Sequence, residues 1–397
     1  MRVTQSLNQA QFLAALTQLE SNLSQTHNQI STNLSFTTPA QNPVAAGSVN
    51  NYDQALAQSQ QYDSNSNSAQ TRLSIEDTAL SQVQTQLQSL RDLALQANNS
   101  SMSSQDRTAI ATQAAQIQKS LVSLANTQDG NGEYIFGGFS TNNPPFTLTA
   151  GGANYTGDQG QRQVQIAAGQ TIADGDNGNS VFNQIKTGNG TFSASAAAGN
   201  TGTGVLGAST VQNPAAYDGG TYAINFTAAN TFEVRDSANA LVTSGTYTDG
   251  QSIAFRGVQV TLNGQPATGD SFTVAPSSNQ SIFTTVQNLV TALTTGNGTS
   301  TTQIKLNNSL GNAINNIDQA LAQTSNIRAT IGARLNTITT QQSVSSSQQI
   351  QLKSSISSLQ SLDYAAAITT LNLQNTTLSA SMQAYTLTQG LTLFKYL

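Results

Sequence analysis

The sequence predicts an α+β protein: a long coiled-coil-like helical bundle built from both ends of the chain, with a β-rich central domain inserted at its far end. Two observations predict this architecture. Apolar residues recur at heptad spacing near both termini and along much of the chain between them. From Asn143 to Pro276 helix signals nearly vanish, and short β-branched or aromatic runs alternate with Gly, Asn and Asp turns. A chain of 397 residues is also long enough for two or three domains.

The N-terminal helical arm is predicted over residues 1–45. Its apolar positions follow coiled-coil spacing, with Thr26 in the one skipped position, and they are Phe12, Leu16, Leu19, Leu23 and Ile30. A stripe with two apolar positions per heptad is buried effectively only against another helix. We therefore expect this arm to pair with a helix of the same chain or of a neighbouring subunit.

The C-terminal helical arm is predicted over residues 361–397 and carries the matching signal. Leu371, Leu378 and Tyr385 repeat every seven positions, with Asn375 between two of their companions. The other apolar positions of this arm are Ile368, Met382, Leu391, Phe394 and Leu397. The arms are charge-poor and have narrow seams, so they are expected to be marginal alone and to gain stability from neighbours.

Between the arms, residues 46–140 are predicted as the N-terminal half of a helical rod. One heptad register begins at Ala69 and continues through Leu73, Leu80, Val83, Leu87, Leu90, Ala94 and Ala97. After a break at 98–101, Ser103 or Ser104 can cap a second helix with Asp106 in its first turn. We expect these two helices to be antiparallel, and the Gly-rich segment 129–132 to end the second.

The β-rich inserted region is predicted over residues 141–280, with a possible extra subdomain at about 188–275. Runs of strand composition lie at 133–139, 162–166, 221–226, 231–234, 253–255 and 258–262. The pentapeptide Thr-Gly-Asn-Gly-Thr occurs at 187–191 and again at 295–299. We interpret the two copies as turns that bracket an insertion.

The C-terminal half of the rod is predicted over residues 281–360, and a single register runs from Leu310 to Leu359. Polar residues interrupt this register. Gln342 and Gln349, together with Asn375 of the arm, are expected to fix the helix register, as single polar residues do in coiled-coil cores.

Composition excludes several classes of function. Only 8% of the residues are charged, against about 25% in average soluble proteins, and the net charge of −5 leaves no basic patch for nucleic acid. No apolar run is long enough to span a membrane. Residues 1–6 do not begin a signal peptide, so we expect any export to proceed without a cleaved signal.

The residues for catalysis are also missing. His27 is the only histidine and there is no cysteine, so no catalytic, metal-binding or cofactor-binding residues are predicted. Gly202–Gly207 matches a phosphate-loop pattern but lacks the flanking strand and helix, and is expected to be a loop. Glu76–Asp77 is interpreted as a solvated or capping pair, and Asp174–Gly178 as a turn. We predict that the protein is not an enzyme.

A resemblance to a known family is carried by the segments Arg2–Ser6, Thr38–Ala46, Leu90–Ala97, Leu124–Gly138, Tyr155–Asp158, Gly269–Pro276 and Leu391–Leu397. Through these segments the chain resembles the flagellar hook-filament junction proteins, the hook-associated protein 3 family of the bacterial flagellin superfamily. The helical arms are similar to flagellin too, whereas Asp129–Gly138 and the final Leu-Phe-Lys-Tyr-Leu favour the junction proteins. Gln41–Asn42 stands where the family usually has acidic residues, and the β region makes the chain longer than many members.

The resemblance implies a structural role at the cell exterior. It implies export through the growing flagellum by the type III apparatus with an export chaperone, and a ring of self-associated subunits between hook-associated protein 1 and flagellin. The thirteen arm residues named above are expected in the assembly interface. Whether they contact other subunits or only pack arm against arm within one chain is left open, and both are compatible with the pattern.

Two other functions remain open at this point. A flagellin-type filament subunit would share the coiled-coil arms but polymerise indefinitely. A surface adhesin would use the β region, where Tyr155, Tyr217, Tyr222 and Tyr247 could stack on sugars. The tyrosines alternate with other apolar residues in strands, which favours core packing.

Overall fold

The computed structural model describes residues 2–99, 102–295 and 300–390, and the chain divides into two compact units. Unit 1 comprises residues 1–64 and 340–397, and unit 2 comprises residues 65–339. Two helices, α2 (Pro43–Ala97) and α5 (Ser300–Gln360), contribute residues to both units. The units are described separately below.

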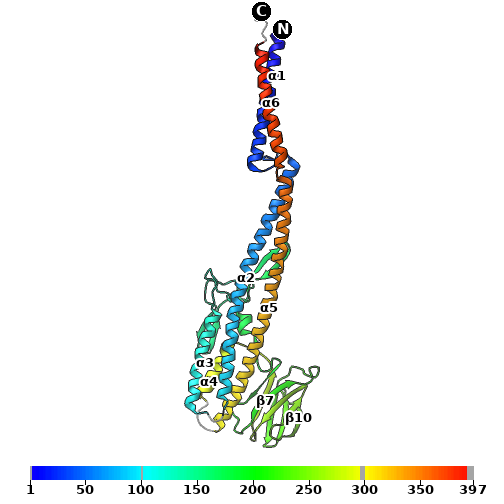
Figure 1. The fold of residues 1–397 in the computed structure, drawn as a ribbon. Coiled ribbons are helices and arrows are strands. Elements are labelled where there is room, and N and C mark those ends of the chain that lie inside the picture. Colours follow the sequence, from blue (N-terminus) through cyan, green and yellow to red (C-terminus); the bar gives the residue numbers. More distant parts are fainter. Residues whose placement is uncertain (1, 100–101, 296–299, 391–397) are drawn as a thin grey trace, which may run out of the picture. The chain divides into compact units, whose positions relative to one another are not determined.

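Unit 1 pairs the two ends of the chain. Helices α1 (Arg2–Thr32) and α6 (Tyr364–Gly390) lie side by side and antiparallel (Figure 1). Their connections to α2 and α5 are tied together by hydrogen bonds from Ser35 N to Gln360 O at 2.7 Å and from Leu362 N to Asn33 O at 3.3 Å. A small core supports this turn; it contains Phe36, Ala45 and Val49, packed against Ile356 and Leu359.

Unit 2 contains the main helical core. Helices α2 and α5 are joined by α3 (Ser104–Ala125) and α4 (Ile282–Thr295), and α3 packs closely on α4 (Figure 1). All eight heptad positions predicted from Ala69 to Ala97 are fully buried. Ser103 is the N-cap of α3, because its Oγ accepts a hydrogen bond from Asp106 N at 3.2 Å.

Short β elements pack against this helical core. They are the hairpins β1 (Phe146–Thr149) with β2 (Gly152–Tyr155) and β3 (Gln163–Ala167) with β4 (Gln170–Ala173), the π-helix η1 (Asn179–Asn183), and β5 (Ile185–Lys186) paired with β14 (Asn279–Gln280). Their packing is aromatic: Phe146, Phe182 and Phe283 form mutual ring contacts at 5.1–5.8 Å.

The predicted strand at 133–139 is wrong. Only Tyr134 makes an isolated bridge, to Gln128, and the segment otherwise consists of turns. Gly138 has a φ of +71°, and a side chain there would collide with Asp158, so the backbone turns where an extended strand would have to continue. Ile135 and Phe136 are nevertheless buried, which explains their strand-like hydrophobicity.

The second part of unit 2 is a two-sheet β domain. One antiparallel sheet has the order β10-β9-β8-β13-β6, and the other has the order β11-β12-β7. The strands are β6 (Phe192–Ala196), β7 (Val205–Val211), β8 (Tyr222–Ala228), β9 (Thr231–Asp236), β10 (Leu241–Thr246), β11 (Ser252–Phe255), β12 (Val258–Asn263) and β13 (Ser271–Pro276). The apolar residues of both sheets form a separate core, which includes Phe226, Tyr247 and Phe272.

Several local predictions can be compared with this domain. Strands β8, β9, β11 and β12 coincide with predicted β runs, and so does the β3 hairpin strand. Gly202 lies in a loop as expected, but β7 begins at Val205, within the same motif. Gly188 and Gly190 take positive φ in a turn at 187–191; the second pentapeptide copy lies almost wholly outside the described residues.

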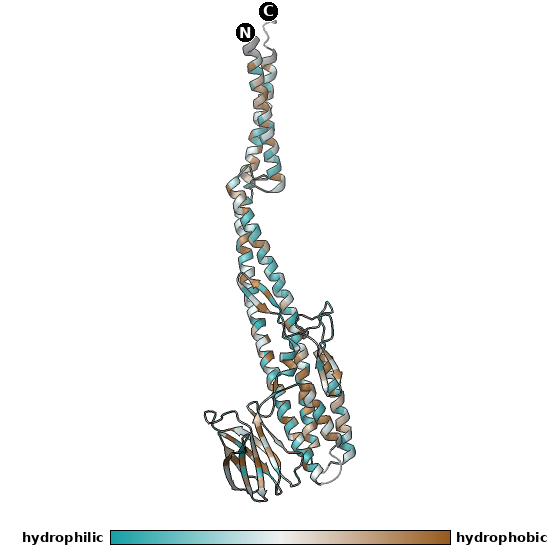
Figure 2. Ribbon diagram, turned by 180° about the vertical axis from the view of Figure 1, so that it is seen from behind, coloured by the Kyte–Doolittle hydropathy of each residue, from teal (hydrophilic) through white to brown (hydrophobic). Residues whose placement is uncertain are grey.

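The predicted fold class, helices from both ends of the chain with a β-rich central domain, is confirmed. Figure 2 shows hydrophobic positions recurring between hydrophilic ones along the helices. Among the described helices, none has a stretch long and apolar enough to cross a membrane.

Candidate assembly surface

The predicted seam of α1 faces α6. Phe12, Leu16, Leu19, Leu23 and Ile30 are all partly buried in the isolated chain. Thr26, which fills the skipped position, is only 6% exposed, and its Oγ1 donates a hydrogen bond to Asn22 O at 3.0 Å. A hydroxyl is tolerated there because it bonds to the preceding turn of its own helix.

One contact of the seam is a pair of aromatic side chains, one from each helix. The rings of Phe12 and Tyr385 stack with centroids 5.0 Å apart and an interplanar angle of 9°. Gln9 Nε2 donates a hydrogen bond to the Tyr385 hydroxyl at 3.2 Å. Such ring pairs contribute about 0.5–1.5 kcal/mol beyond the area that they bury.

On α6 the companion positions differ from those expected. Leu371, Leu378 and Tyr385 lie on the seam, but Ile368 and Met382 are 42% and 48% exposed. The smaller or polar residues one position earlier, Ala367, Gln374 and Ser381, take the seam positions. Adjacent helical residues point about 100° apart, so a seam that runs through Ala367, Gln374 and Ser381, where α6 packs on α1, leaves Ile368 and Met382 exposed. Leu391, Phe394 and Leu397 lie outside the described residues.

The three polar residues that were expected to fix the helix register differ in burial. Asn375 is exposed and therefore cannot fix the α1–α6 register. Gln342 and Gln349 are partly buried, and Gln349 Nε2 donates to Ser59 Oγ at 3.4 Å in a polar layer where Ser59 and Ser345 hydroxyls are 2.9 Å apart.

Unit 1 concentrates the exposed apolar surface of the described chain. Eleven of the fifteen exposed large hydrophobic side chains belong to it, although it is the smaller unit. Those on the paired arms are Leu7, Leu13, Tyr364, Ile368, Leu373, Met382 and Leu387. Sequence reasoning missed Leu373 and Leu387, whose separation of two heptads was the available signal.

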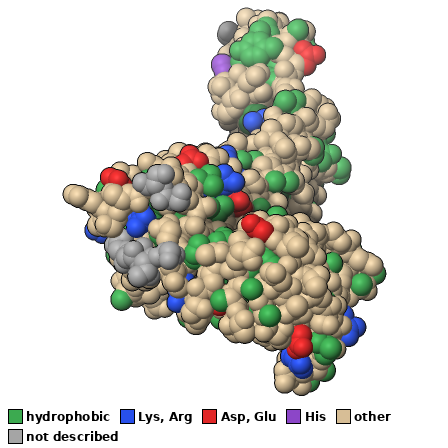
Figure 3. All heavy atoms as spheres, turned by 90° about the horizontal axis from the view of Figure 1, so that it is seen from below, with side chains coloured by type: hydrophobic (Ala, Val, Ile, Leu, Met, Phe, Trp, Pro, Cys, Tyr) green, Lys and Arg blue, Asp and Glu red, His purple; other side chains and the backbone are tan. Residues whose placement is uncertain are grey.

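The arms also carry almost no charge. Helix α6 has no charged residue over 27 positions, and the only ones in α1 are Arg2 and Glu20, beside the exposed His27. In the view from below, the charged side chains lie scattered over a surface that consists mostly of other side chains and backbone (Figure 3). Low charge and exposed apolar side chains together are typical of surfaces that become buried in an assembly.

A minority of the charged residues form a cluster inside unit 2. Three of the 14 basic and five of the 19 acidic residues belong to it; they are Arg72, Glu76, Asp129, Glu133, Arg162, Asp174, Asp176 and Arg334. Arg72 Nη1 lies 2.6 Å from Asp129 Oδ2, and Arg334 makes two hydrogen bonds to Asp176 at 2.9 and 3.0 Å.

Glu76 corrects the sequence interpretation of Glu76–Asp77 as a solvated pair. Its side chain is 1% exposed, and Asp77 pairs with Arg328 at 2.8 Å. Burial, and secondarily the charge of Asp176, raise the pKa of Glu76 well above its ordinary value. Asp174–Gly178 likewise is not a simple turn, because Asp174 and Asp176 anchor it to Arg162 and Arg334.

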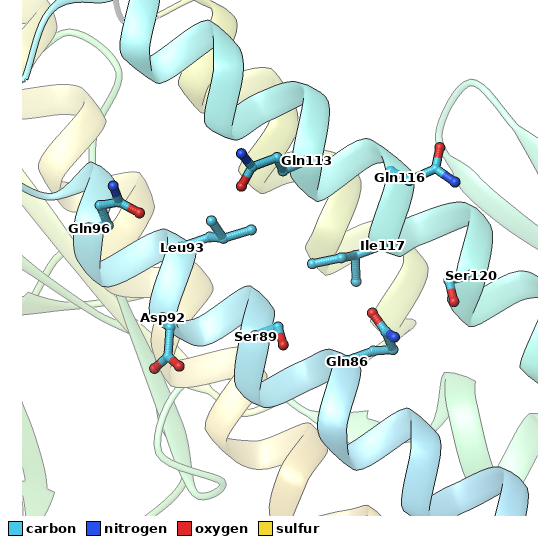
Figure 4. A pocket seen from close by; sticks show the side chains of 9 residues that line it. All are labelled: Gln86, Ser89, Asp92, Leu93, Gln96, Gln113, Gln116, Ile117 and Ser120. Atoms are coloured by element: carbon cyan, nitrogen blue, oxygen red, sulfur yellow. The ribbon is translucent and has the colours of Figure 1, made fainter.

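A surface groove of about 600 Å³ lies between α2 and α3 (Figure 4). Leu93 and Ile117 point toward one another across it, and the rim consists of Gln and Ser side chains with Asp92 as the single ionisable group. The lining offers neither a nucleophile–base pair nor opposed carboxylates. Of the four tyrosines considered for sugar stacking, Tyr222 and Tyr247 are buried and therefore unsuited, whereas Tyr155 and Tyr217 are partly buried.

Three protein-family models match separate parts of this chain. The bacterial flagellin N-terminal helical region matches residues 3–141, and the flagellin C-terminal helical region matches residues 314–397. Residues 195–276 match the D2-like domain of flagellar hook-associated protein 1.

Individual relatives agree with these matches. Flagellar hook-associated protein 3 of Salmonella typhimurium is 33% identical over 185 residues, an alignment that spans 47% of this chain and 58% of that relative. The structure of the flagellar junction protein FlgL from Legionella pneumophila superposes with a TM-score of 0.72 at 28% identity, covering 79% of this chain and all of that one. Xanthomonas campestris FlgL superposes with a TM-score of 0.73 at 40% identity, covering 77% of this chain and 99% of that one. With a relative matched at that identity over nearly its whole length, this chain belongs to the flagellar hook-associated protein 3 (FlgL) family.

Proposed function

We propose that this protein is a structural junction subunit of the bacterial flagellum, which joins the hook, through hook-associated protein 1, to the flagellin filament. The observation that carries the proposal is the pair of charge-poor arms, which have exposed apolar side chains in addition to those of their mutual seam. A helix that is apolar on several sides requires several neighbours. Membership of the FlgL family supports the same role.

The partners follow from the position of a junction. Copies of this chain form a ring, one face of which contacts hook-associated protein 1 and the other flagellin, so the contacts are heterologous but do not propagate. The thirteen arm residues predicted from sequence, with Leu373 and Leu387 added, form these contacts. The protein is exported unfolded by the flagellar type III apparatus with a chaperone, orders on assembly at the cell exterior, and has no enzymatic activity.

The role is tested with a strain that lacks the gene. Electron microscopy of the cell surface and an immunoassay for flagellin in the medium are the two measurements. We expect bare hooks together with flagellin shed into the medium. Normal filaments on the deletion strain would contradict the proposal.

The arm surface is tested by complementing that strain with the double variant Leu373→Ser, Leu387→Ser. These side chains are 67% and 70% exposed, so their replacement should leave the fold of the monomer intact while removing apolar contacts to neighbours. We expect loss of filaments with normal export of the variant. The matched control is Leu241→Ser, a 55% exposed leucine of the β domain, which should restore filaments.

A further inference from the structure

Phe139 presents an aromatic ring on the surface of unit 2. It is 66% exposed, and among the described phenylalanines it is the only one with an exposed side chain. The others lie in the cores of the protein or, for Phe12, on the arm seam. A single exposed apolar side chain is common on protein surfaces, so the argument depends on how the backbone holds this one.

The loop around Phe139 is fixed by Asp158. The Phe139 backbone N–H donates to Asp158 Oδ1 at 3.0 Å, and the Gly160 N–H donates to the same oxygen at 2.6 Å. The Asp158 backbone is held in turn, because its N–H donates to Gly137 O at 3.2 Å and its carbonyl oxygen accepts from the Tyr155 hydroxyl at 2.5 Å. The backbone that carries Phe139 is therefore tied in place within the monomer.

Two glycines allow this loop and the ring to take their positions. Gly138 has a φ of +71°. A methyl group on Gly160 would overlap the Phe139 ring, so the ring lies directly against the Gly160 backbone. The ring is supported there, while most of its surface stays in contact with solvent. A side chain that is already held in this way loses little conformational entropy when a partner covers it.

The same unit contains a hollow with complementary chemistry, which we call the Ile75–Leu124 hollow. It measures about 560 Å³ and involves residues 70–82 of α2 and the end of α3, whereas the groove of Figure 4 involves residues 86–96 of α2. Its apolar lining residues are Ile75, Ala79 and Leu124, and its other six are Gln, Ser or Thr. Phe139 does not line the hollow, so the two do not meet within one chain.

The lining of the hollow is uncharged although α2 has three charged residues in the same stretch. Arg72 and Glu76 are buried in the charged cluster, and Asp77 pairs with Arg328 of α5 at 2.8 Å. The segment 137–145, which carries Phe139, is also uncharged. An acidic or basic partner gains nothing from these two surfaces, whereas an aromatic ring and an apolar hollow suit each other.

We propose that Phe139 of one copy of this chain inserts into the Ile75–Leu124 hollow of a neighbouring copy. The inference rests on the proposed function, because a ring of identical subunits requires a heterologous contact in which each copy offers two different surfaces. Phe139 and the hollow are two such surfaces on one unit. This contact adds to those of the arms and joins neighbouring subunits through unit 2.

Photo-cross-linking in assembled flagella tests the contact. The deletion strain is complemented with Phe139→p-benzoylphenylalanine, which keeps an aromatic ring and on irradiation bonds to C–H groups that it touches. We expect a product of two copies of the chain, in which mass spectrometry places the link on the peptide that contains Ile75 or Leu124. A link elsewhere in the chain, a link to another protein, or no product in cells that carry filaments would overturn the inference.

The matched control for the photoreactive group is Leu148→p-benzoylphenylalanine. Leu148 is a 48% exposed residue of β1, also in unit 2, and does not line the hollow. We expect no link from position 148 to Ile75 or Leu124. A link to the hollow from both positions would show that the reaction does not depend on a specific contact of Phe139.

A charge placed in the hollow tests the contact from the other side. Thr78 lines the hollow and is exposed, and its Oγ1 donates only to Ser74 O of its own helix among the printed contacts of this side chain, at 2.8 Å. In Thr78→Lys combined with the photoreactive group at 139, we expect the yield of linked copies to fall about tenfold.

The control is Thr330→Lys, because Thr330 is an exposed threonine of α5 with the same kind of hydrogen bond, to Asn326 O at 3.0 Å. It should leave the yield unchanged, and thermal unfolding followed by circular dichroism checks that both variants fold. Equal yields in the two lysine variants would contradict the proposed contact.

This contact and the proposed function can fail independently. The deletion strain reports whether the chain is needed for filaments, whereas the cross-link reports which surfaces meet. Bare hooks on the deletion strain together with a link outside the hollow would overturn the contact and leave the function standing. Normal filaments on the deletion strain would contradict the function whatever the cross-link shows.

Discussion

Glu76 is a carboxyl group buried in a protein that has few charges, and its titration should be visible in stability. Its pKa is raised in the folded state, chiefly by burial and then by Asp176, while Arg334 and Arg72 oppose the shift. At pH values below the unfolded pKa the group is protonated in both states and costs nothing. As pH rises from there toward the folded pKa, the native state binds more protons than the unfolded state, so its contribution to stability declines.

We therefore expect Glu76→Gln to flatten this decline. The variant should gain unfolding free energy relative to the wild type as pH increases from about 4.5 upward. Urea unfolding followed by circular dichroism at a series of pH values measures the difference. Glu20→Gln on the exposed surface of α1 is the control, and a difference that is the same at every pH would contradict the expectation.

At the residue scale, sequence could not have located Glu76. Adjacent residues on a helix point about 100° apart, so one member of the Glu76–Asp77 pair can be buried while the other pairs with Arg328. The groups that surround Glu76 include Asp176 and Arg334, which are distant in the sequence. By contrast, the lone His27 was assigned correctly to an exposed helix face, because its local surroundings are entirely polar.

At the element scale, α6 depends on packing against α1. It contains no charged residue for side-chain ion pairs or for interaction with the helix dipole, so its stability must come from the seam. Tyr385→Ala removes the stacked pair with Phe12 and should destabilise the arm pair by about 1–3 kcal/mol. Hydrogen exchange of α1 and α6 amides should accelerate. Leu387→Ala, two residues away and exposed, should leave exchange unchanged; equal acceleration in both would argue against a specific seam.

A second element-scale contact attaches β7 to α5. The Asn308 side chain, 6% exposed, accepts from Leu206 N at 2.8 Å and donates to Gly204 O at 3.1 Å. Asn308→Ala leaves both backbone groups unpaired, which should cost about 1–3 kcal/mol and speed exchange of the Leu206 amide. Asn315→Ala, on the exposed side of α5, is the control and should change neither; an unaltered Leu206 amide in Asn308→Ala would show that the contact is dispensable.

Helices were more predictable than strands for a physical reason. The α2 register from Ala69 to Ala97 is set by a repeat of large side chains that recurs along a single helix. Strands β6 and β7 are built largely from Ala, Ser, Gly and Thr, and their pairing with distant strands leaves no local alternation to detect. On α6, hydrophobicity favoured Ile368 and Met382 over Ala367 and Ser381, because sequence does not report how closely two helices approach.

At the scale of the whole molecule, the shared arms raise the question of what stops assembly. An unlimited filament requires each subunit to offer two mutually complementary faces, whereas a junction subunit meets one kind of neighbour on each side. We expect the purified full chain, at concentrations where flagellin polymerises and with fragments of its own aggregates added as seeds, to show no increase of light scattering with time and no long filaments by electron microscopy. The same chain should still cap hooks that carry hook-associated protein 1. Continuous growth from the seeds would mean that the two faces are complementary to each other, and the protein would then be a filament subunit that shares the arms but not the role of a junction.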